Sequence, residues 1–349
     1  MSNRTRTVVI TGADSGIGFE AAVQFANTGF GRVVVTARTD AKAEQAVTAL
    51  VARSGTTVFT PLTLDLDDRA SIDAAADTLV ESGTTDVLVL NAGGLPRRKL
   101  VRSSAGIERH AAALTGHHRF TMRLLETGGL SPSARIMIAG SESLRGDLPI
   151  VKPLDVDRLA KKYYDGNLER LIEAIMRVES PIRYNAIAQF ATTKLFAAWW
   201  AAALSRRLPA GMTVNAIAPG STPETNGFDD TPMLSRRIAT SVMWLIPRST
   251  QPVAAAAGRY LVAANFGSEI NGAFFASRPR RSAGPMVHNE LVDATNPRVL
   301  RCLWNATERL AGRHDVALPN PAPAHAPEGT HIPRPVRPTG PIITAACSQ

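Results

Sequence analysis

The sequence predicts an α/β fold in which a mostly parallel sheet is covered by helices on both faces. Apolar runs of four to seven residues alternate with helical, alanine-rich patterns, and no internal repeat interrupts them. The first apolar run leads directly into a glycine-rich turn and then into a helical pattern. Strands that alternate with helices at this spacing form βαβ units. We therefore expect one doubly wound domain over residues 1–312.

Each expected element follows from its own residue pattern. Runs of Val, Ile and Leu that are too short for a helix are typical of buried parallel strands. They occur at residues 7–10, 32–36, 58–64, 87–90, 135–139 and 213–218. Helical patterns occur at residues 18–27, at 41–51 and from about Ser71 onwards. The alternation predicts six strands joined by helical crossovers.

One internal segment departs from this alternation. Residues 144–183 separate the fifth strand from the next long helix, which is expected around residues 186–207. A further helix is expected within the segment, over residues 167–178, because its apolar residues recur at helical spacing. We expect this insertion to form either a lid over the substrate or a surface or oligomer contact.

The C-terminal segment, residues 313–349, has a different composition. Eight prolines fall between Pro319 and Pro341, and large apolar side chains are almost absent there. Proline has no backbone N–H to donate, and too little apolar surface is available for a packed core. We expect this tail to be extended or disordered.

The composition indicates an ordinary globular protein, with 44% hydrophobic and 20% charged residues. The formal net charge is +9, but the basic residues are scattered without an aromatic platform, so nucleic acid is not an expected partner. Two cysteines without metal-ligand spacing favour a cytoplasmic protein with no metal site. Polar residues interrupt the apolar run at 186–204, which predicts a buried helix and no membrane span.

The glycine-rich turn, Thr11-Gly12-Ala13-Asp14-Ser15-Gly16-Ile17-Gly18, predicts a dinucleotide site. Gly12 permits a tight turn, Gly16 lets the backbone approach a pyrophosphate, and Gly18 lets the helix pack closely on the sheet. The helix N-terminus offers unpaired N–H groups and the positive end of its dipole to phosphates. The candidate cofactor-binding residues of the turn are Thr11, Gly12, Ser15, Gly16, Ile17 and Gly18.

Arg38 follows the second apolar run, in Thr36-Ala37-Arg38-Thr39. An acidic residue at this place would bind the adenosine ribose hydroxyls and repel a 2′-phosphate. A guanidinium would instead bind that phosphate through charge-assisted hydrogen bonds. Arg38 therefore favours NADP over NAD, and a solvated Arg at a helix start is the alternative.

Several motifs, taken in chain order, resemble those of the short-chain dehydrogenase/reductase family. The residue 11–18 turn comes first, and VNAIAPG at residues 214–220 follows the sixth strand. LWNATERL at residues 303–310 is similar to the C-terminal helix of the retinol-dehydrogenase-like branch. The resemblance implies a Rossmann-type fold, a small-molecule substrate and further cofactor contacts. These implied contacts are Asp65, Leu66, Asn91, Ala92, Gly93, Pro219 and Gly220.

The resemblance also implies where the catalytic groups lie. The family transfers hydride between a nicotinamide and a carbonyl/alcohol pair, with a Tyr donor, a Lys beside it, a Ser that polarises the carbonyl and an Asn that holds a water. Ser141 and Lys194 match the Ser and the Lys, and Lys194 is also an implied cofactor ligand. Phe190 stands at the Tyr position, four residues before Lys194, and Ala113 (or Leu114) stands at the Asn position. We therefore expect atypical proton delivery.

Other side chains are candidates for the missing proton donor, although a structural role is the alternative for each. Tyr184 lies ten residues before Lys194, about 80° away round a helix, so it needs the chain to fold back over the pocket. His110 and His117 share a helical face with Ala113. The full set of candidates is Tyr163, Tyr164, Tyr184, His110, His117 and Glu142.

Two functions remain open at this point. The first is an NADP-dependent oxidoreductase that interconverts a carbonyl and an alcohol on a small organic substrate. The alternative is a non-redox catalyst or a cofactor-binding pseudoenzyme on the same scaffold. The family uses two long helices as a four-helix interface, here around residues 106–125 and 186–207, which implies a homodimer or homotetramer.

Overall fold

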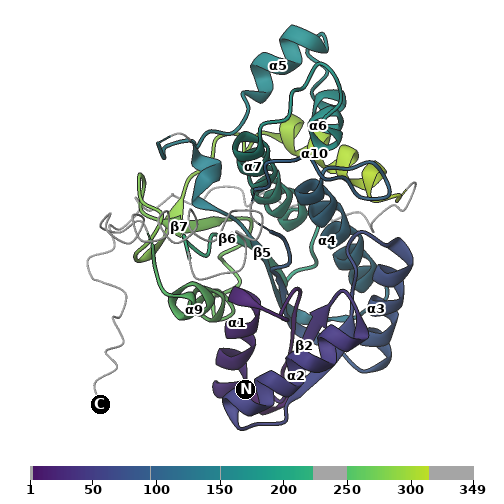
Figure 1. Ribbon diagram of the computed structural model, residues 1–349, viewed down its shortest axis with the longest axis vertical. Coiled ribbons are helices and arrows are strands. Elements are labelled where there is room, and N and C mark those ends of the chain that lie inside the picture. The colour runs from purple at the N-terminus through teal and green to yellow at the C-terminus, as the bar shows by residue number, and fades with distance from the viewer. Residues whose placement is uncertain (1–2, 95, 150, 223–249, 314–349) are drawn as a thin grey trace, which may run out of the picture.

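A computed structural model describes residues 3–94, 96–149, 151–222 and 250–313 (Figure 1). The expectations for the proline-rich tail fall outside these residues, and the division of the chain at residue 312 stays a prediction. A short 3-10 turn, Asn3–Thr5, precedes the first strand.

An eight-stranded sheet lies at the centre of the described structure, in the order β3-β2-β1-β4-β5-β6-β7-β8. The first seven strands run parallel and β8 runs antiparallel to β7. Chain order reverses between β1 and β4, so the loops after these two strands meet at one edge, where such folds bind ligands. The six predicted strands are β1 (Thr7–Ile10), β2 (Arg32–Ala37), β3 (Phe59–Thr63), β4 (Thr85–Leu90), β5 (Leu130–Ala139) and β6 (Thr213–Ile217).

Two strands are additions to the predicted set. They are β7 (Phe274–Ser277) and β8 (Met286–Asn289), which pair with Phe274 opposite Asn289. Each has only four residues, and β8 includes His288 and Asn289, so no apolar run marks it in the sequence. β7 pairs with β6, and β8 pairs with β7 at the edge of the sheet, which sequence spacing does not show.

Helices cover both faces of the sheet, as the alternation predicts (Figure 1). On β1, Val8 faces one apolar cluster and Val9 the other, since successive strand residues point to opposite faces. The cluster on one face draws on α1 (Gly16–Asn27), α2 (Asp40–Ser54) and α9 (Val253–Ala263). The other draws on α3 (Arg69–Glu81), α4 (Arg109–Glu126) and α7 (Ala186–Ser205).

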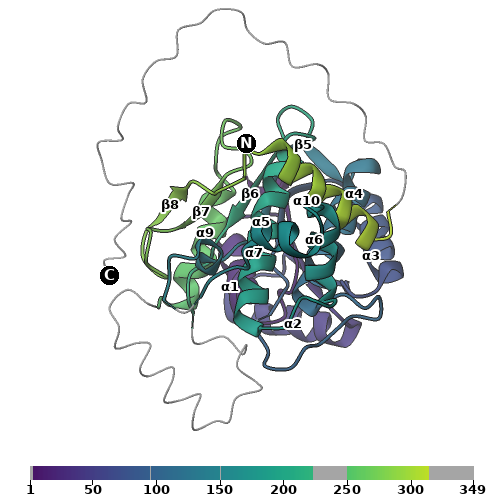
Figure 2. The same cartoon turned by 90° about the horizontal axis from the view of Figure 1, so that it is seen from above.

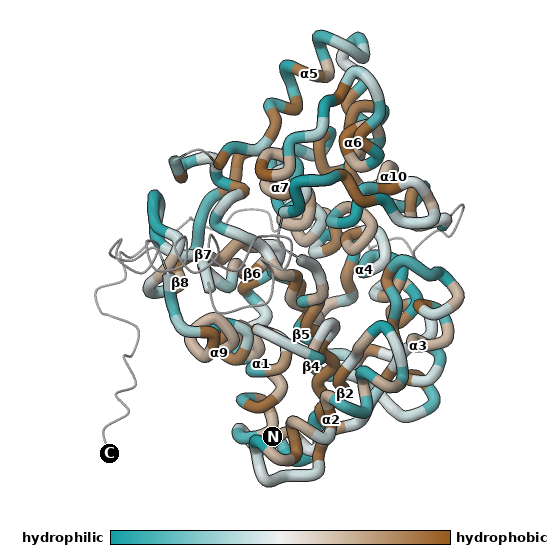
Figure 3. The backbone as a smooth tube through the Cα atoms, viewed as in Figure 1, coloured by the Kyte–Doolittle hydropathy of each residue, from teal (hydrophilic) through white to brown (hydrophobic). Residues whose placement is uncertain are grey.

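The insertion forms three short elements. They are η2 (Glu142–Arg145), α5 (Val156–Tyr163) and α6 (Leu168–Arg177). The expected helix over 167–178 is α6, whose apolar stripe is buried, and α5 is an addition. Figure 3 shows hydrophobic residues concentrated in the sheet and on the inner sides of the helices.

The last described helix, α10 (Pro297–Leu310), packs on α6, α7 and α4 (Figure 2). The whole middle of α7, Ala191–Thr193 and Phe196–Leu204, is buried. Most of α4 is buried in the same way. Within the chain, α6 and α10 thus occupy part of the surface of the two helices expected to form a four-helix interface, and the oligomeric state stays a prediction.

The apolar run at 186–204 forms most of α7, which lies in the interior as predicted. Within the described ranges, no helix is long and apolar enough to cross a bilayer. Among the same residues, no group of His, Cys, Asp and Glu side chains has the arrangement of a metal site.

Candidate active site

The glycine-rich turn adopts a backbone that only glycine tolerates easily. Gly12 and Gly16 have φ angles of +63° and +58°. A Cβ on Gly18 would lie 2.3 Å from the Gly12 carbonyl oxygen, so this glycine is required by close packing. Ser15 precedes α1 without a side-chain capping bond. The first N–H groups of α1 therefore lack a side-chain cap, as a phosphate site at a helix N-terminus requires.

The loop after β4 is hydrogen-bonded to this turn. The Ala92 amide donates to Thr11 Oγ1 at 2.9 Å, and Asn91 Nδ2 donates to the carbonyl oxygens of Thr11 and Gly12 at 3.0 and 3.3 Å. The Tyr260 hydroxyl donates to Asn91 Oδ1 at 3.2 Å. The bonds join the loops at the switch point of the sheet, and the exposed Gly93 follows directly.

Arg38 and the loop after β3 lie near each other at the adenosine end of the site. Arg38 is exposed and follows the last residue of β2. The pKa of Asp67 is raised by burial and by Asp65, while Arg109 and Arg38 oppose this shift. The charge of Arg38 thus reaches the Asp65–Asp67 segment. A Cβ on Gly116 of α4 would lie 2.5 Å from the carbonyl oxygen of Leu66, so α4 holds this loop in place.

Lys194 is anchored at the end of β5. Its Nζ donates to the carbonyl oxygen of Ala139 at 2.7 Å, and burial lowers its pKa to about 8. Phe190 lies one helical turn before it, and Nζ is 5.8 Å from the centroid of the phenyl ring. This is within the range of a cation–π contact. The ring offers no proton at this position.

Ser141 follows the same strand end and caps η2. Its Oγ accepts hydrogen bonds from the Ser143 amide at 3.2 Å and from the Ser143 hydroxyl at 2.9 Å. Because Lys194 is bonded to Ala139, two residues earlier on β5, the structure brings Ser141 and Lys194 to one place. The catalytic roles of the two residues stay a prediction.

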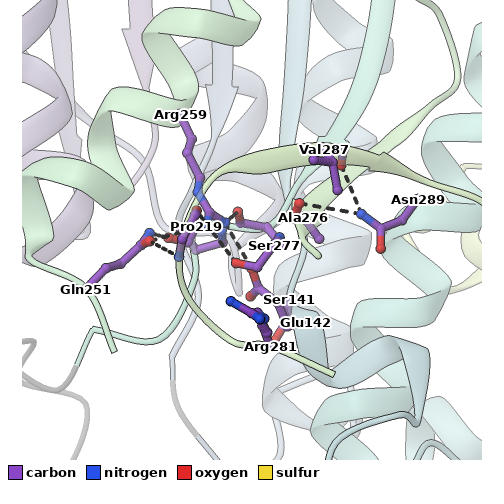
Figure 4. Close-up of polar contacts among 12 residues, drawn as sticks. Ser141, Glu142, Pro219, Gln251, Arg259, Ala276, Ser277, Arg281, Val287 and Asn289 are labelled. Atoms are coloured by element: carbon purple, nitrogen blue, oxygen red, sulfur yellow. Dashed lines mark hydrogen bonds and ion pairs between the residues drawn. The ribbon is translucent and has the colours of Figure 1, made fainter. Parts of the chain in front are cut away.

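Glu142 belongs to a buried ion pair, so the structure contradicts its candidacy as a proton donor to substrate. Its Oε1 accepts from Arg259 Nη1 at 2.9 Å and from the Ser277 hydroxyl at 3.0 Å (Figure 4). The Glu142 and Arg259 side chains are only 4% and 6% exposed. A carboxylate held by a guanidinium and a hydroxyl is bound in place.

The same ion pair holds the loop after β6. Arg259 Nη1 also donates to the Ala218 carbonyl oxygen at 2.5 Å, and Arg259 Nη2 reaches Gln251 Oε1 at 3.3 Å (Figure 4). Gln251 Nε2 donates in turn to the Pro219 carbonyl oxygen. Gly220 has a φ of +83°, and a Cβ there would lie 2.5 Å from Gln251 Nε2. The loop carrying Pro219 and Gly220 is therefore fixed relative to the Ser141 segment.

A small cavity of about 20 Å³ lies between α4, α7 and the end of β5. Ala113, His110, His117 and Lys194 all contribute to its wall. A cavity of this size holds one water molecule. Ala113, at the position where the family resemblance implies an Asn, forms part of the cavity wall.

His117 lies at the inner side of this cavity and is neutral. Its Nε2 is 2.9 Å from Thr11 Oγ1. Burial and the nearby Lys194 charge lower its pKa to about 3. A neutral imidazole bonded to Thr11 supports the glycine-rich turn.

His110 lies at the cavity wall against Phe190. The two rings meet edge to face, with centroids 5.3 Å apart. His110 Nδ1 is 2.8 Å from Glu108 Oε1, and both side chains are buried. The second oxygen of Glu108 caps α4 by accepting from the backbone amides of His110 and Ala111. Glu108 therefore fixes both the helix start and the imidazole.

Comparisons with known proteins agree with this geometry. A family profile described as short chain dehydrogenase matches residues 6–112. The chain is 28% identical over 352 residues to human dehydrogenase/reductase SDR family member 13, covering 96% of this chain and 82% of that protein. It is 26% identical over 313 residues to human retinol dehydrogenase 13, covering 88% of this chain and 85% of that protein.

A solved structure shows the same fold. An uncharacterised protein from Mycobacterium paratuberculosis superimposes with a TM-score of 0.62 at 22% identity, covering 90% of this chain and 95% of the other. Over most of its length the chain is similar to short-chain dehydrogenase/reductases. These proteins are NAD(P)-dependent oxidoreductases, and the relatives related to retinol dehydrogenase confirm the predicted branch.

The three candidate tyrosines do not line this cavity. The Tyr184 hydroxyl donates to the Arg97 carbonyl oxygen at 2.7 Å, before α7 begins. Burial, and then the charge of Glu108, raise its pKa. Tyr163 is 41% exposed at the end of α5, and Tyr164 packs half-buried against the main core. The structure therefore gives none of them a place beside Lys194.

Two residues of the site had no signal in the sequence analysis. Glu108 was missed because it is the N-cap residue of α4. It therefore lies just before the helical pattern that contains His110. Arg259 was missed because its partners come from Glu142, Ser277 and Gln251, on three different segments. A charged residue in the apolar α9 stretch, VAAAAGRYLVA, was the available clue.

Proposed function

We propose that this chain interconverts a carbonyl and an alcohol on a small organic substrate with NADP(H) as its cofactor. The observation that carries the proposal is the convergence of Lys194 and Ser141 at the end of β5, beside the glycine-rich turn. Lys194 Nζ is bonded to Ala139 at 2.7 Å, and Ser141 follows two residues later. Similarity to short-chain dehydrogenase/reductases supports the reaction type, and the geometry supports its place.

The residues present fit a dinucleotide. Gly12 and Gly16 have the positive φ angles of a phosphate-binding turn, and the start of α1 has no side-chain cap. Thr11, Asn91 and Ala92 would hold the middle of the cofactor, while Pro219 and Gly220 would face its nicotinamide. When bound, NADPH supplies a hydride to a carbonyl carbon.

Arg38 supports the preference for NADP over NAD. It is exposed directly after β2, and its charge reaches the Asp65–Asp67 segment. A guanidinium there would neutralise a 2′-phosphate, whereas the ribose hydroxyls of NAD would gain no charge-assisted bond. We expect Arg38→Glu to weaken NADPH binding by about 10-fold or more. This corresponds to a loss of about 1.4 kcal/mol in binding free energy.

Two side chains would act on the substrate and cofactor directly. The Ser141 hydroxyl would donate to the substrate oxygen and polarise its carbonyl. The Lys194 ammonium would bind the nicotinamide ribose hydroxyls, in the absence of a phenol at position 190.

We also infer a cytoplasmic location. The chain has only two cysteines, which cannot form a disulfide framework and lack a metal-ligand spacing, and this is typical of a reducing compartment.

The test is titration with NADPH and NADH, followed by stoichiometric hydride transfer to a broad panel of ketones and aldehydes. We expect tighter binding of NADPH and loss of its absorbance with at least one carbonyl. Ser141→Ala should slow that transfer without changing NADPH affinity. Tight NADPH binding with no hydride transfer to any carbonyl would instead favour the non-redox alternative. The Phe190 ring, which has no ionisable proton, supports that alternative.

A further inference from the structure

We propose that the buried Glu108–His110 pair supplies the proton that a phenol at position 190 cannot supply. This inference rests on the proposed carbonyl–alcohol reaction. It assigns a catalytic role to His110, with Glu108 as its positioning residue. Three features of His110 support this role: its contact with Phe190, its bond to Glu108, and the cavity that it shares with Lys194.

The position of His110 is the first feature. Its ring meets the Phe190 ring edge to face at 5.3 Å between centroids, so the imidazole and phenyl groups are in van der Waals contact. His110 also lines the same cavity as Lys194. The imidazole therefore occupies the neighbourhood where the family's proton donor acts.

The bond to Glu108 is the second feature. A carboxylate 2.8 Å from Nδ1 accepts a hydrogen bond from the proton on that nitrogen and fixes the orientation of the ring. The same carboxylate caps α4, so its position is fixed by two backbone amides. A carboxylate that orients an imidazole from behind is a common arrangement for proton transfer by histidine.

During carbonyl reduction, one proton passes from His110 to the substrate oxygen. One N–H bond of the His110 imidazolium breaks, and one O–H bond forms on the substrate oxygen as the carbonyl carbon receives hydride. The Nδ1–H remains bonded to Glu108, and solvent returns one proton to the neutral imidazole. In alcohol oxidation the same atoms move in the opposite direction.

Other titratable groups surround His110, and they fit this role less well. His117 stays neutral because burial lowers its pKa to about 3. Lys194 is bonded to the Ala139 carbonyl oxygen, which holds its ammonium towards β5. Tyr184 feels the charge of Glu108 but donates to Arg97. Arg109 adjoins His110 on α4 and remains charged throughout the working pH range.

The decisive measurement is single-turnover hydride transfer with saturating NADPH across the pH range. We expect His110→Gln to lower the rate by about 10²-fold or more, the usual contribution of a general acid. NADPH affinity should be unchanged. The fall in rate that accompanies loss of the imidazolium proton at rising pH should disappear. His288→Gln is the matched control, because His288 is exposed and packs on Phe275, away from the cavity.

A second variant separates chemistry from folding. His110→Gln with Phe190→Tyr restores a phenol one turn before Lys194, so we expect it to recover most of the lost rate. In the protein without cofactor, imidazole nitrogen NMR should show a protonated Nδ1 on His110. Glu108→Gln should change that signal, while the amide oxygen still caps α4.

Two results would overturn the inference. One is a His110→Gln enzyme that transfers hydride at the original rate with the original pH dependence. The other is a double variant that folds and binds NADPH but recovers nothing. Failure of the proposed function looks different: the unmodified chain would bind NADPH and reduce no carbonyl, which removes both proposals together.

Discussion

At the scale of single residues, the Glu142–Arg259 pair ties together the two segments that carry Ser141 and Pro219. Removing one partner of a buried ion pair leaves an uncompensated charge. We expect Glu142→Gln to lower the free energy of unfolding by about 3 kcal/mol. Chemical denaturation measures this change. Asp77→Asn is the control, since the Arg123–Asp77 pair is 41% and 47% exposed and should be worth less than about 1 kcal/mol.

Gly116 makes a second prediction at this scale. A Cβ there would lie 2.5 Å from the Leu66 carbonyl oxygen, so Gly116→Ala must push α4 away from the loop that contacts the adenosine end. We expect a loss of about 1–3 kcal/mol in the free energy of unfolding, with weaker NADPH binding. The helical Gly258 is a matched control, because its Cβ would make only a 3.5 Å contact with Gln24. Gly258→Ala should be neutral or stabilising.

The sequence predicted those site residues whose roles depend on backbone shape. Gly12, Gly16 and Gly18 could be assigned because a turn between a strand and a helix constrains them locally. Lys194 and Ser141 could be assigned through the family's spacing. The Glu108–His110 pair could not, since its meaning depends on Phe190, which approaches from α7.

At the scale of elements, α6 and α10 cover α4 and α7 within one chain. With those faces buried, we expect the protein to be monomeric. Light scattering after size-exclusion chromatography of the full chain, from low to high concentration, checks this. A dimer whose interface includes α4 and α7, seen by cross-linking, would contradict the observed packing.

Leu303 offers a way to test what α10 does. It is fully buried in α10, at the contact with the main core. We expect Leu303→Ala to cost about 2–5 kcal/mol in the free energy of unfolding, because it leaves a cavity. Thermal unfolding measures this. The exposed Val262, on α9, is the control, and Val262→Ala should change stability by less than about 0.5 kcal/mol.

β1, β2 and β6 were predictable because each is buried in the sheet and carries a continuous apolar pattern. β1 matches its predicted range, and β2 and β6 differ by one residue. β7 and β8 are short and lie at one end of the sheet, where strand pairing and not composition decides the structure. The cover supplied by α10 was also unpredictable, since an amphipathic pattern does not say which neighbours it meets.

At the scale of the whole molecule, buried histidine makes stability depend on pH. The pKa of His117 falls from 6.5 to about 3 on folding, so the unfolded chain binds its proton first. The stability linked to His117 is complete above pH 6.5 and is lost as pH falls from 6.5 towards 3. Its slope is at most about 1.4 kcal/mol per pH unit.

Denaturation of the protein and of His117→Gln at several pH values between 6.5 and 4 tests this. Gln keeps a polar partner for Thr11 without a titrating ring. We expect a shallower loss of stability in the variant. Parallel curves for the two proteins would show that His117 takes up a proton in the folded state.

The packing of α6 and α10 on α4 and α7 also affects which amino-acid substitutions this protein can accept. In a symmetric assembly every substitution at the interface appears twice and must suit its own copy. Here each side of the contact is encoded separately, so a change in α4 can be matched by a change in α10 alone. A monomer built in this way would fold independently of dilution, and each copy would carry a complete active site.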